Sequence, residues 1–351
     1  MKDAGFRSSP SLYSSPSFRS SLSLRISHFA FRFPFLVVNA LMSDHFDGRR
    51  FRNPSGRNGL GFRDVWRMLR TKRAPWPARI DVLQQRPPAP AADGETIVTF
   101  IGHSTFLLQT SAGNAITDPI FSDRASPVSF AGPRRVRAPG VSIDDLPEIS
   151  LVLLSHNHYD HCDVPALRAL FRRFAPRVLT PLGNAALLRA AGARDAGELD
   201  WWQQASAGKF TVTLTPAQHF SARSPLDRNK ALWGGFLISA GRHRVYFAGD
   251  SGYGPHFGDI GARGAIDLAL LPIGAYEPRW FMQDIHMNPE EAVQAHLDLR
   301  AARSIAMHHG TFQLTPEPID EPVHRLRAAL VARGIPAGRF VAVEPGTSLS
   351  V

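Results

Sequence analysis

The feature that most constrains this chain of 351 residues is a six-residue segment rich in histidine. Residues 156–161 read HNHYDH and follow the apolar run Leu151 to Leu154. Such a run predicts a buried strand that ends at Ser155, after which a loop presents three histidines and a carboxylate together. A solvated histidine-rich loop is the alternative, but it does not explain why these residue types follow a buried strand.

The spacing within the segment predicts metal binding. On an extended backbone His156 and His158 point to the same side, so both can bind one metal ion. Asp160 and His161 follow as the chain turns toward a helix, where they can reach a second metal nearby. Imidazole and carboxylate ligands suit zinc, iron or manganese.

Composition narrows the class of protein. Apolar residues make up 44% and charged residues 20% of the chain, as in ordinary globular proteins. The one cysteine, Cys162, rules out an internal disulfide and fits a reducing compartment, so we expect a cytoplasmic protein. No apolar run reaches the roughly 18 to 20 residues needed to span a bilayer.

The net charge of +10 lies entirely in residues 1–73. The remaining chain carries 26 basic and 26 acidic residues and is neutral. A basic arm of this kind predicts contact with an anionic surface, either phospholipid or nucleic acid; a solvated tail is the alternative for residues 1–41. The basic charge lies outside the following domain, which argues against a nucleic-acid groove, and we expect peripheral contact with an anionic membrane instead.

Three regions follow along the chain. Residues 1–41 are rich in serine and arginine and resemble a transit peptide, although we favour a disordered or spurious extension before Met42. Residues 42–95 form a basic lead-in that we expect to pack on the domain. It includes a short amphipathic helix around Val65 to Leu69 that could face a membrane. Residues 96–351 are predicted to form one hydrolase domain.

The domain alternates short strands with helices, which predicts an α/β (α+β) fold. Strands are expected at Thr96–Phe100, Phe106–Thr110, Asn114–Thr117, Leu151–Leu154, Arg177–Thr180, Phe210–Thr215, Leu232–Ser239, Val245–Ala248, Leu268–Leu271 and Ser304–Ala306. Helices are expected at Val164–Phe174, Asn184–Ala191, Pro289–Asp298 and Glu321–Ala332.

The HxHxDH pattern resembles the metallo-β-lactamase superfamily, which implies a four-layer αββα sandwich. The resemblance also implies the remaining ligands. His219 matches the third histidine of the first metal, Asp250 the carboxylate that bridges both metals, and His308 the last ligand of the second. His309 is the rival to His308 and is kept as a residue behind the ligands.

Two further polar residues follow early strands. Asp118 could orient a metal-binding histidine through the free ring N–H. His103 could play a similar part or be a core histidine with satisfied hydrogen bonds. Cys162 follows a predicted ligand, but we interpret it as a small packed residue.

Several longer motifs resemble the N-acyl-phosphatidylethanolamine-hydrolysing phospholipase D family, from about Phe46 to Phe312. The shared pieces are FRNP at 51–54, IGHST at 101–105, TDPIFS at 117–122, FAGDSGY at 247–253, PIGAYEPRWFM at 272–282, His286 and PEEA at 289–292. The run at 272–282 is the most specific of these.

This resemblance implies a zinc-dependent phospholipase D with two zinc ions, which releases phosphatidic acid and an N-acylethanolamine from a phospholipid. It implies that His286 lies near the catalytic centre and contacts the phosphate. Ile285 replaces a glutamine of the animal enzyme, which bears on headgroup recognition. Relatives are homodimers with a lipid groove that residues 280–282 could line, or these residues could be plain core.

The expected chemistry uses a hydroxide shared by the two metals, with Asp160, Asp250 and His286 as the catalytic residues. The same hydroxide attacks a carbonyl carbon or a phosphorus, so a lactonase or another small-molecule hydrolase is the alternative. A metal-dependent nuclease and a non-catalytic metal-binding protein are less compatible with the charge distribution and the complete ligand set.

Overall fold

The computed structural model of the chain describes residues 43–53, 61–89, 92–111 and 113–351. The expectations for residues 1–41 lie outside the described residues. Among the described residues, no helix is long enough and apolar enough to cross a bilayer.

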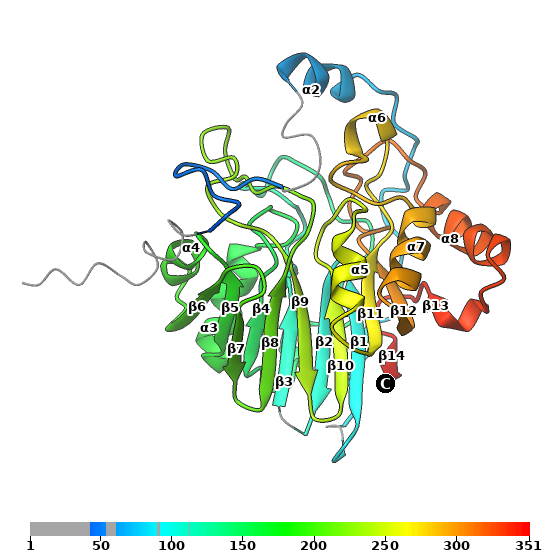
Figure 1. The fold of residues 1–351 in the computed structure, drawn as a ribbon. Helices are drawn as coiled ribbons and strands as arrows, with labels where there is room; N and C mark the ends of the chain where they lie inside the picture. The colour runs from blue at the N-terminus through cyan, green and yellow to red at the C-terminus, as the bar shows by residue number, and fades with distance from the viewer. Residues whose placement is uncertain (1–42, 54–60, 90–91, 112) are drawn as a thin grey trace, which may run out of the picture. The chain divides into compact units, whose positions relative to one another are not determined.

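Two seven-stranded mixed sheets pack face to face (Figure 1). The first sheet has the strand order β14 (Ser348–Ser350), β1 (Thr96–Gly102), β2 (Thr105–Thr110), β3 (Gly113–Thr117), β4 (Leu151–Leu153), β5 (Arg177–Pro181) and β6 (Asp195–Leu199). The second has the order β13 (Phe340–Val341), β12 (Ala301–Met307), β11 (Ile266–Pro272), β10 (His243–Phe247), β9 (Gly235–Ala240), β8 (Phe210–Thr215) and β7 (Gln204–Ala207).

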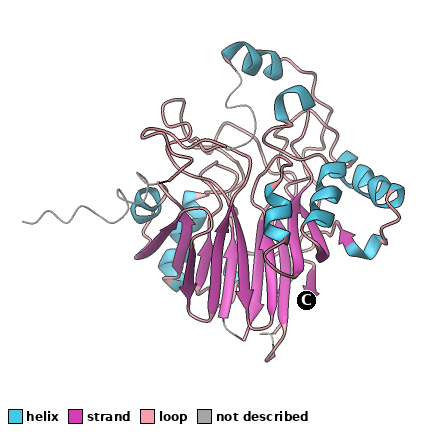
Figure 2. Cartoon of the chain, in the orientation of Figure 1, coloured by secondary structure: helices cyan, strands magenta, loops and turns pink. Residues whose placement is uncertain are grey.

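Helices cover the outer faces of both sheets, which confirms the predicted four-layer sandwich (Figure 2). The first sheet carries α3 (Val164–Phe174) and α4 (Ala185–Ala190), and the second carries α5 (His256–Gly261), α7 (Pro289–Asp298) and α8 (Glu321–Ala332). Two short helices, α2 (Phe62–Leu69) and α6 (Arg279–Met282), lie beyond the upper strand ends in Figure 1. Two 3-10 turns span Ile143–Asp145 and Ala337–Arg339.

Side chains along a strand alternate between the two faces of the sheet. This explains why one apolar core forms between the sheets and a second forms beneath the helices. In β2, Phe106 and Leu108 belong to the core between the sheets, whereas Leu107 points into the core beneath α3. Strand β4 repeats the pattern, with Val152 facing the helix layer. Because successive side chains of a strand point to opposite faces, a sheet buried on both sides needs such uninterrupted apolar runs.

The sequence predicted three helices with the same bounds as in the structure, namely α3, α7 and α8. Asp163 caps α3 by accepting a hydrogen bond from the Ala166 N–H at 3.3 Å. Asn288 caps α7 by accepting from the Glu291 N–H at 2.8 Å, and the Glu291 carboxylate accepts from the Asn288 N–H at 3.0 Å. These caps satisfy backbone donors that the first helical turn leaves free.

Strand starts were predicted less well: β12 begins at Ala301, three residues before the expected Ser304, and β9 begins three residues later than expected. The strand expected from Leu232 begins at Gly235, because the preceding residues bond to loops instead of a neighbouring strand. The Leu232 N–H donates to the Leu182 carbonyl at 2.7 Å, and the Gly234 N–H donates to the Ser155 carbonyl at 3.1 Å. The segment thereby ties the second sheet to the start of the histidine loop.

The described part of the lead-in contacts the domain at separate points. The Asn53 side chain donates to the carbonyl of His219 at 2.9 Å. The backbone N–H groups of Ala74 and Ile80 donate to the carbonyls of Pro316 and Val136.

Candidate metal centre

The predicted ligands follow the ends of strands in both sheets. Each sheet changes from antiparallel to parallel pairing part-way across, between β3 and β4 in the first sheet and between β10 and β11 in the second. The histidine loop follows β4, and Asp250 follows β10. In α/β sheets, ligands commonly bind outside the carboxyl ends of strands.

A first group of four residues comprises His156, His158, His219 and Asp250. The Nδ1 atom of His158 lies 2.9 Å from His156 Nε2 and 3.1 Å from His219 Nε2. Burial lowers the pKa of His158 to about 3 and that of His219 to about 4. Three neutral ring nitrogens that converge in this way offer lone pairs to one cation.

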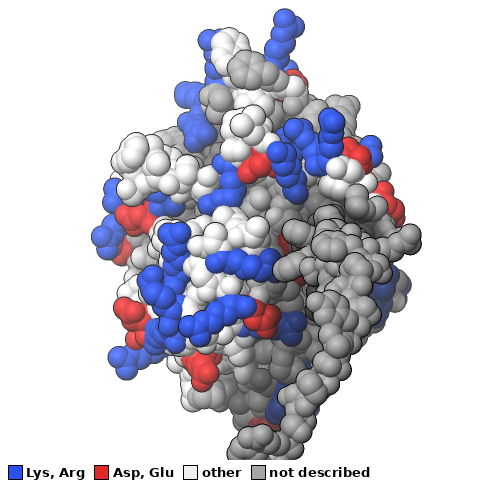
Figure 3. All heavy atoms as spheres, turned by 90° about the vertical axis from the view of Figure 1, so that its left-hand side faces the viewer, with Lys and Arg blue, Asp and Glu red and all other residues white. Residues whose placement is uncertain are grey.

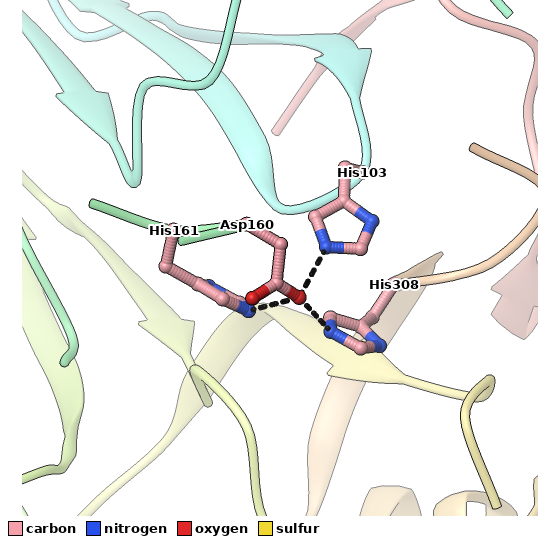
Figure 4. A group of neighbouring side chains, drawn as sticks. All are labelled: His103, Asp160, His161 and His308. Atoms are coloured by element: carbon pink, nitrogen blue, oxygen red, sulfur yellow. Dashed lines mark hydrogen bonds and ion pairs between the residues drawn. The ribbon is translucent and has the colours of Figure 1, made fainter. Parts of the chain in front are cut away.

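A second group comprises His103, Asp160, His161 and His308 (Figure 4). The three histidines surround Asp160 Oδ2, which lies 3.1 Å from His103 Nε2, 3.3 Å from His308 Nε2 and 3.5 Å from His161 Nε2. All four side chains are largely or fully buried.

Asp250 lies between the two groups. Its Oδ2 atom is 3.1 Å from the Nε2 atoms of both His161 and His308, and 3.8 Å and 3.7 Å from those of His156 and His219. The Asp250 carboxylate is therefore within reach of both groups, and its bridging of two metals stays a prediction.

The residues present fit a pair of metal ions. Asp250 Oδ1 is buried and has no hydrogen-bond partner, which costs free energy unless a cation or water binds it. Burial opposes charge on His308, but the adjacent Asp250 carboxylate raises its pKa to about 9. Metal ions that bind here would displace such protons, since imidazole must be neutral to act as a ligand.

Comparison with known proteins identifies the family. A family model described as a beta-lactamase superfamily domain matches residues 114–309, more than half of the chain. The chain belongs to the β-lactamase superfamily. An uncharacterised protein of Mycobacterium tuberculosis is 47% identical over 238 residues, which are 66% of this chain and 63% of that relative. The match therefore spans just under two thirds of that relative's length.

A second relative confirms the narrower resemblance. The N-acyl-phosphatidylethanolamine-hydrolysing phospholipase D 1 of Caenorhabditis elegans is 39% identical over 263 residues, which cover 71% of this chain and 74% of the relative. Among solved structures, a metallo hydrolase of the archaeon Ignicoccus hospitalis shares the fold with a TM-score of 0.55 and 23% identity, over 73% of this chain and 98% of that one. The chain thus has the metallo-β-lactamase fold.

Asp118 holds one of the superfamily histidines in place, as the sequence indicated. Its Oδ2 atom accepts a hydrogen bond from His161 Nδ1 at 2.7 Å, and Oδ1 accepts from the Ser155 N–H at 2.7 Å. Asp118 is fully buried. The contact fixes which ring nitrogen of His161 faces the site.

We expect Asp118→Asn to lower metal affinity by about 10- to 100-fold, the usual effect of losing such a partner. The amide cannot accept the His161 proton as strongly, so the ring is less well oriented. Competition with a coloured chelator measures the affinity. Asp267→Asn, on β11 away from both groups, is the control; equal affinities for the two variants would contradict the role of Asp118.

Three of the eight non-glycine residues with positive φ in the described part of the chain lie at this site. His103, Asp118 and His308 have positive φ values of 56°, 31° and 58°. Residues with a Cβ adopt this region at a cost, and they do so mostly at functional sites. These three residues therefore hold an unfavourable backbone conformation that the surrounding fold stabilises.

The other candidate residues take different places. His286 lies beside the pair, with its Nε2 atom 4.0 Å from Asp250 Oδ2. His309 is in neither group. Burial raises the pKa of Cys162 to about 12, so its thiol is no nucleophile at neutral pH and the packed interpretation agrees with the structure. The seven predicted ligands come together, and their binding of metal stays a prediction.

The structure shows further residues that contact the predicted ligands. Sequence reasoning left His103 with two possible roles and gave Asn53 none. His103 joins the second group instead of packing separately in the core. Asn53 accepts from the His219 N–H at 3.3 Å while donating to the His219 carbonyl, so it holds that histidine from both sides. Its place in the FRNP motif was the available signal. The Ile285 carbonyl lies 2.9 Å from His219 Nδ1, a backbone contact that any residue there could make.

Proposed function

We propose that this hydrolase cleaves the phosphodiester of an N-acylated phosphatidylethanolamine. The supporting observation is the position of Asp250 between two ligand groups, with His286 beside it. The 39% identity to a phospholipase of this activity supports the choice of substrate. In the reaction, water adds OH to phosphorus and the bond to the N-acylethanolamine oxygen breaks. That oxygen gains the proton, which leaves phosphatidic acid.

Each of the two ligand groups would bind one metal ion. His156, His158 and His219 would hold one ion, Asp160, His161 and His308 the other, and Asp250 both. Once bound, two such ions lower the pKa of a shared water and neutralise charge on the phosphodiester. We propose zinc, which histidine-rich sets favour, and the same set accepts iron or manganese.

His286 is suited to bind the substrate phosphate. Burial lowers the pKa of its imidazole, so the ring is neutral and keeps an N–H to donate to a phosphoryl oxygen. Its backbone carbonyl accepts a hydrogen bond from Arg279 Nη1 at 2.9 Å, and Arg279 is itself fixed by two bonds of 2.8 Å to Glu291. The helix α7 thereby anchors the segment that carries His286.

Direct assay of product tests the proposal. Purified protein is incubated with N-acyl-phosphatidylethanolamine, an aryl phosphodiester and a panel of lactones. We expect free N-acylethanolamine, with loss of that product in His156→Ala. Turnover of lactones alone would replace the phospholipase proposal with the lactonase alternative.

We also propose a homodimer in which residues 280–282 line a groove for lipid. Trp280 and Phe281 are only half-buried within one chain, whereas Met282 is buried. The Trp280 ring packs against the guanidinium of Arg67 from α2 at 4.4 Å. Sedimentation velocity measures the state, and a monomer at all concentrations would contradict it.

A further inference from the structure

Two loops beside the metal centre carry large apolar side chains at their exposed tips. The first loop, residues 122–134, is part of the connection from β3 to β4. The second loop, residues 221–230, is part of the connection from β8 to β9. Phe130 in the first loop is 81% exposed and Leu226 in the second is 80% exposed. Val128, 37% exposed, is a second apolar residue of the first loop, so three exposed apolar side chains lie on these two loops.

The bases of both loops are fixed to the histidine loop. The Tyr159 hydroxyl, between two predicted ligands, donates to the Arg223 carbonyl at 2.9 Å. Arg223 Nη1 donates to the carbonyls of Asn157 at 2.9 Å and Cys162 at 3.0 Å. The Ser122 N–H donates to Asp163 at 2.8 Å. These bonds hold the bases of both loops next to the predicted ligands of residues 156–161.

A groove of about 370 Å³ lies between the first loop and the start of α3, and more basic than acidic side chains line it. Arg124, Arg168 and Arg223 line it, together with Tyr159. Of its two acids, Asp163 is buried and occupied with backbone N–H groups, and Asp123 pairs with Arg134 at 3.7 Å.

The positive charge continues onto the helix layer of the first sheet. Arg168 also lines a second groove along α3 and the end of α4, with Arg172, Arg173 and Arg194. Figure 3 shows that Lys and Arg outnumber Asp and Glu on this face.

We propose that the tips of these two loops dock the enzyme on a bilayer that contains anionic lipid. Phe130 and Leu226 enter the interfacial layer while the arginines meet lipid phosphates, a combination that membrane surfaces bind. The inference rests on the proposed function, since it places the mouth of the metal centre against the surface that holds the substrate.

Vesicle sedimentation tests the docking surface in the intact protein. Vesicles of phosphatidylcholine are compared with vesicles that also contain phosphatidylglycerol. We expect binding to the anionic vesicles, weakened by salt. The double variant Phe130→Ser, Leu226→Ser should bind about tenfold or more weakly, because two large apolar side chains no longer enter the interface.

Val331→Ser is the matched control, since Val331 is 81% exposed but lies on α8. The control should bind vesicles like the parent, and both variants should hydrolyse a soluble aryl phosphodiester at the parent rate. Vesicle binding unchanged in the tip variant, or equally reduced in the control, overturns the docking surface. Because the readout is binding, tip-dependent docking without release of N-acylethanolamine would uphold the surface and reject only the proposed substrate.

Discussion

Asp250→Asn is expected to reduce hydrolysis by at least about three orders of magnitude, more than loss of one transition-state donor costs. The Oδ2 atom of Asp250 faces two histidines of the second group at 3.1 Å and two of the first at 3.7 and 3.8 Å. An amide lacks the negative charge of the carboxylate, so residue 250 would no longer balance the charge of the two cations that the groups would hold. The measurement is kcat/KM on a soluble aryl phosphodiester.

The control for this variant is Asp267→Asn. Asp267 also accepts a backbone hydrogen bond, from the Arg244 N–H at 2.8 Å, but it lies at the start of β11 away from the ligands. We expect near-parental activity from it. An Asp250→Asn protein that folds, binds metal and keeps more than about a tenth of its activity would mean that Asp250 does not bridge.

Removing metal is expected to abolish activity and destabilise the fold. A chelator should leave the converging histidines of the first group and the buried carboxylates without a partner cation. If free metal stands near 100 times the Kd of each site, loss of each ion removes about 2.7 kcal/mol and lowers Tm by about 5 to 10 °C. Thermal unfolding and the diester assay are followed in parallel.

Adding metal back to the chelated protein distinguishes loss of metal from irreversible damage to the protein. Zinc should restore both activity and Tm, whereas magnesium should not, because it prefers oxygen ligands and octahedral geometry. Full activity of the chelated protein would argue for a metal-free reaction.

The sequence predicted elements whose signals are local. Helix α7 begins at Pro289 after the capping residue Asn288, and the structure has it at Pro289–Asp298. Strands β2 and β4 were placed by apolar runs, because both faces of their sheet are covered. The histidine loop directly follows β4, so this part of the site followed from the same signals.

Four short strands had no such signal. Strand β6 reads DAGEL and β7 reads QASA, without the β-branched or aromatic residues that strands favour. They lie at the outer edge of each sheet and are held by one neighbour, β5 and β8 respectively. Strands β13 and β14 have only two and three residues. Tertiary pairing, not local preference, makes them strands.

The remaining site residues were placed by resemblance, not by pattern. A lone histidine such as His219 or His308 after a strand has many structural explanations, and only the fold brings it to residues 156–161. The role of His103 could not be settled from sequence, because its contact with Asp160 joins residues 57 positions apart.

Metal content is the measurement that tests the central claim most directly. Protein purified in the presence of zinc and passed through a desalting column is analysed for metals by mass spectrometry. The arrangement of two ligand groups around Asp250 predicts two transition-metal ions per chain. A content of one ion or none, in protein that hydrolyses the diester, would contradict a binuclear centre.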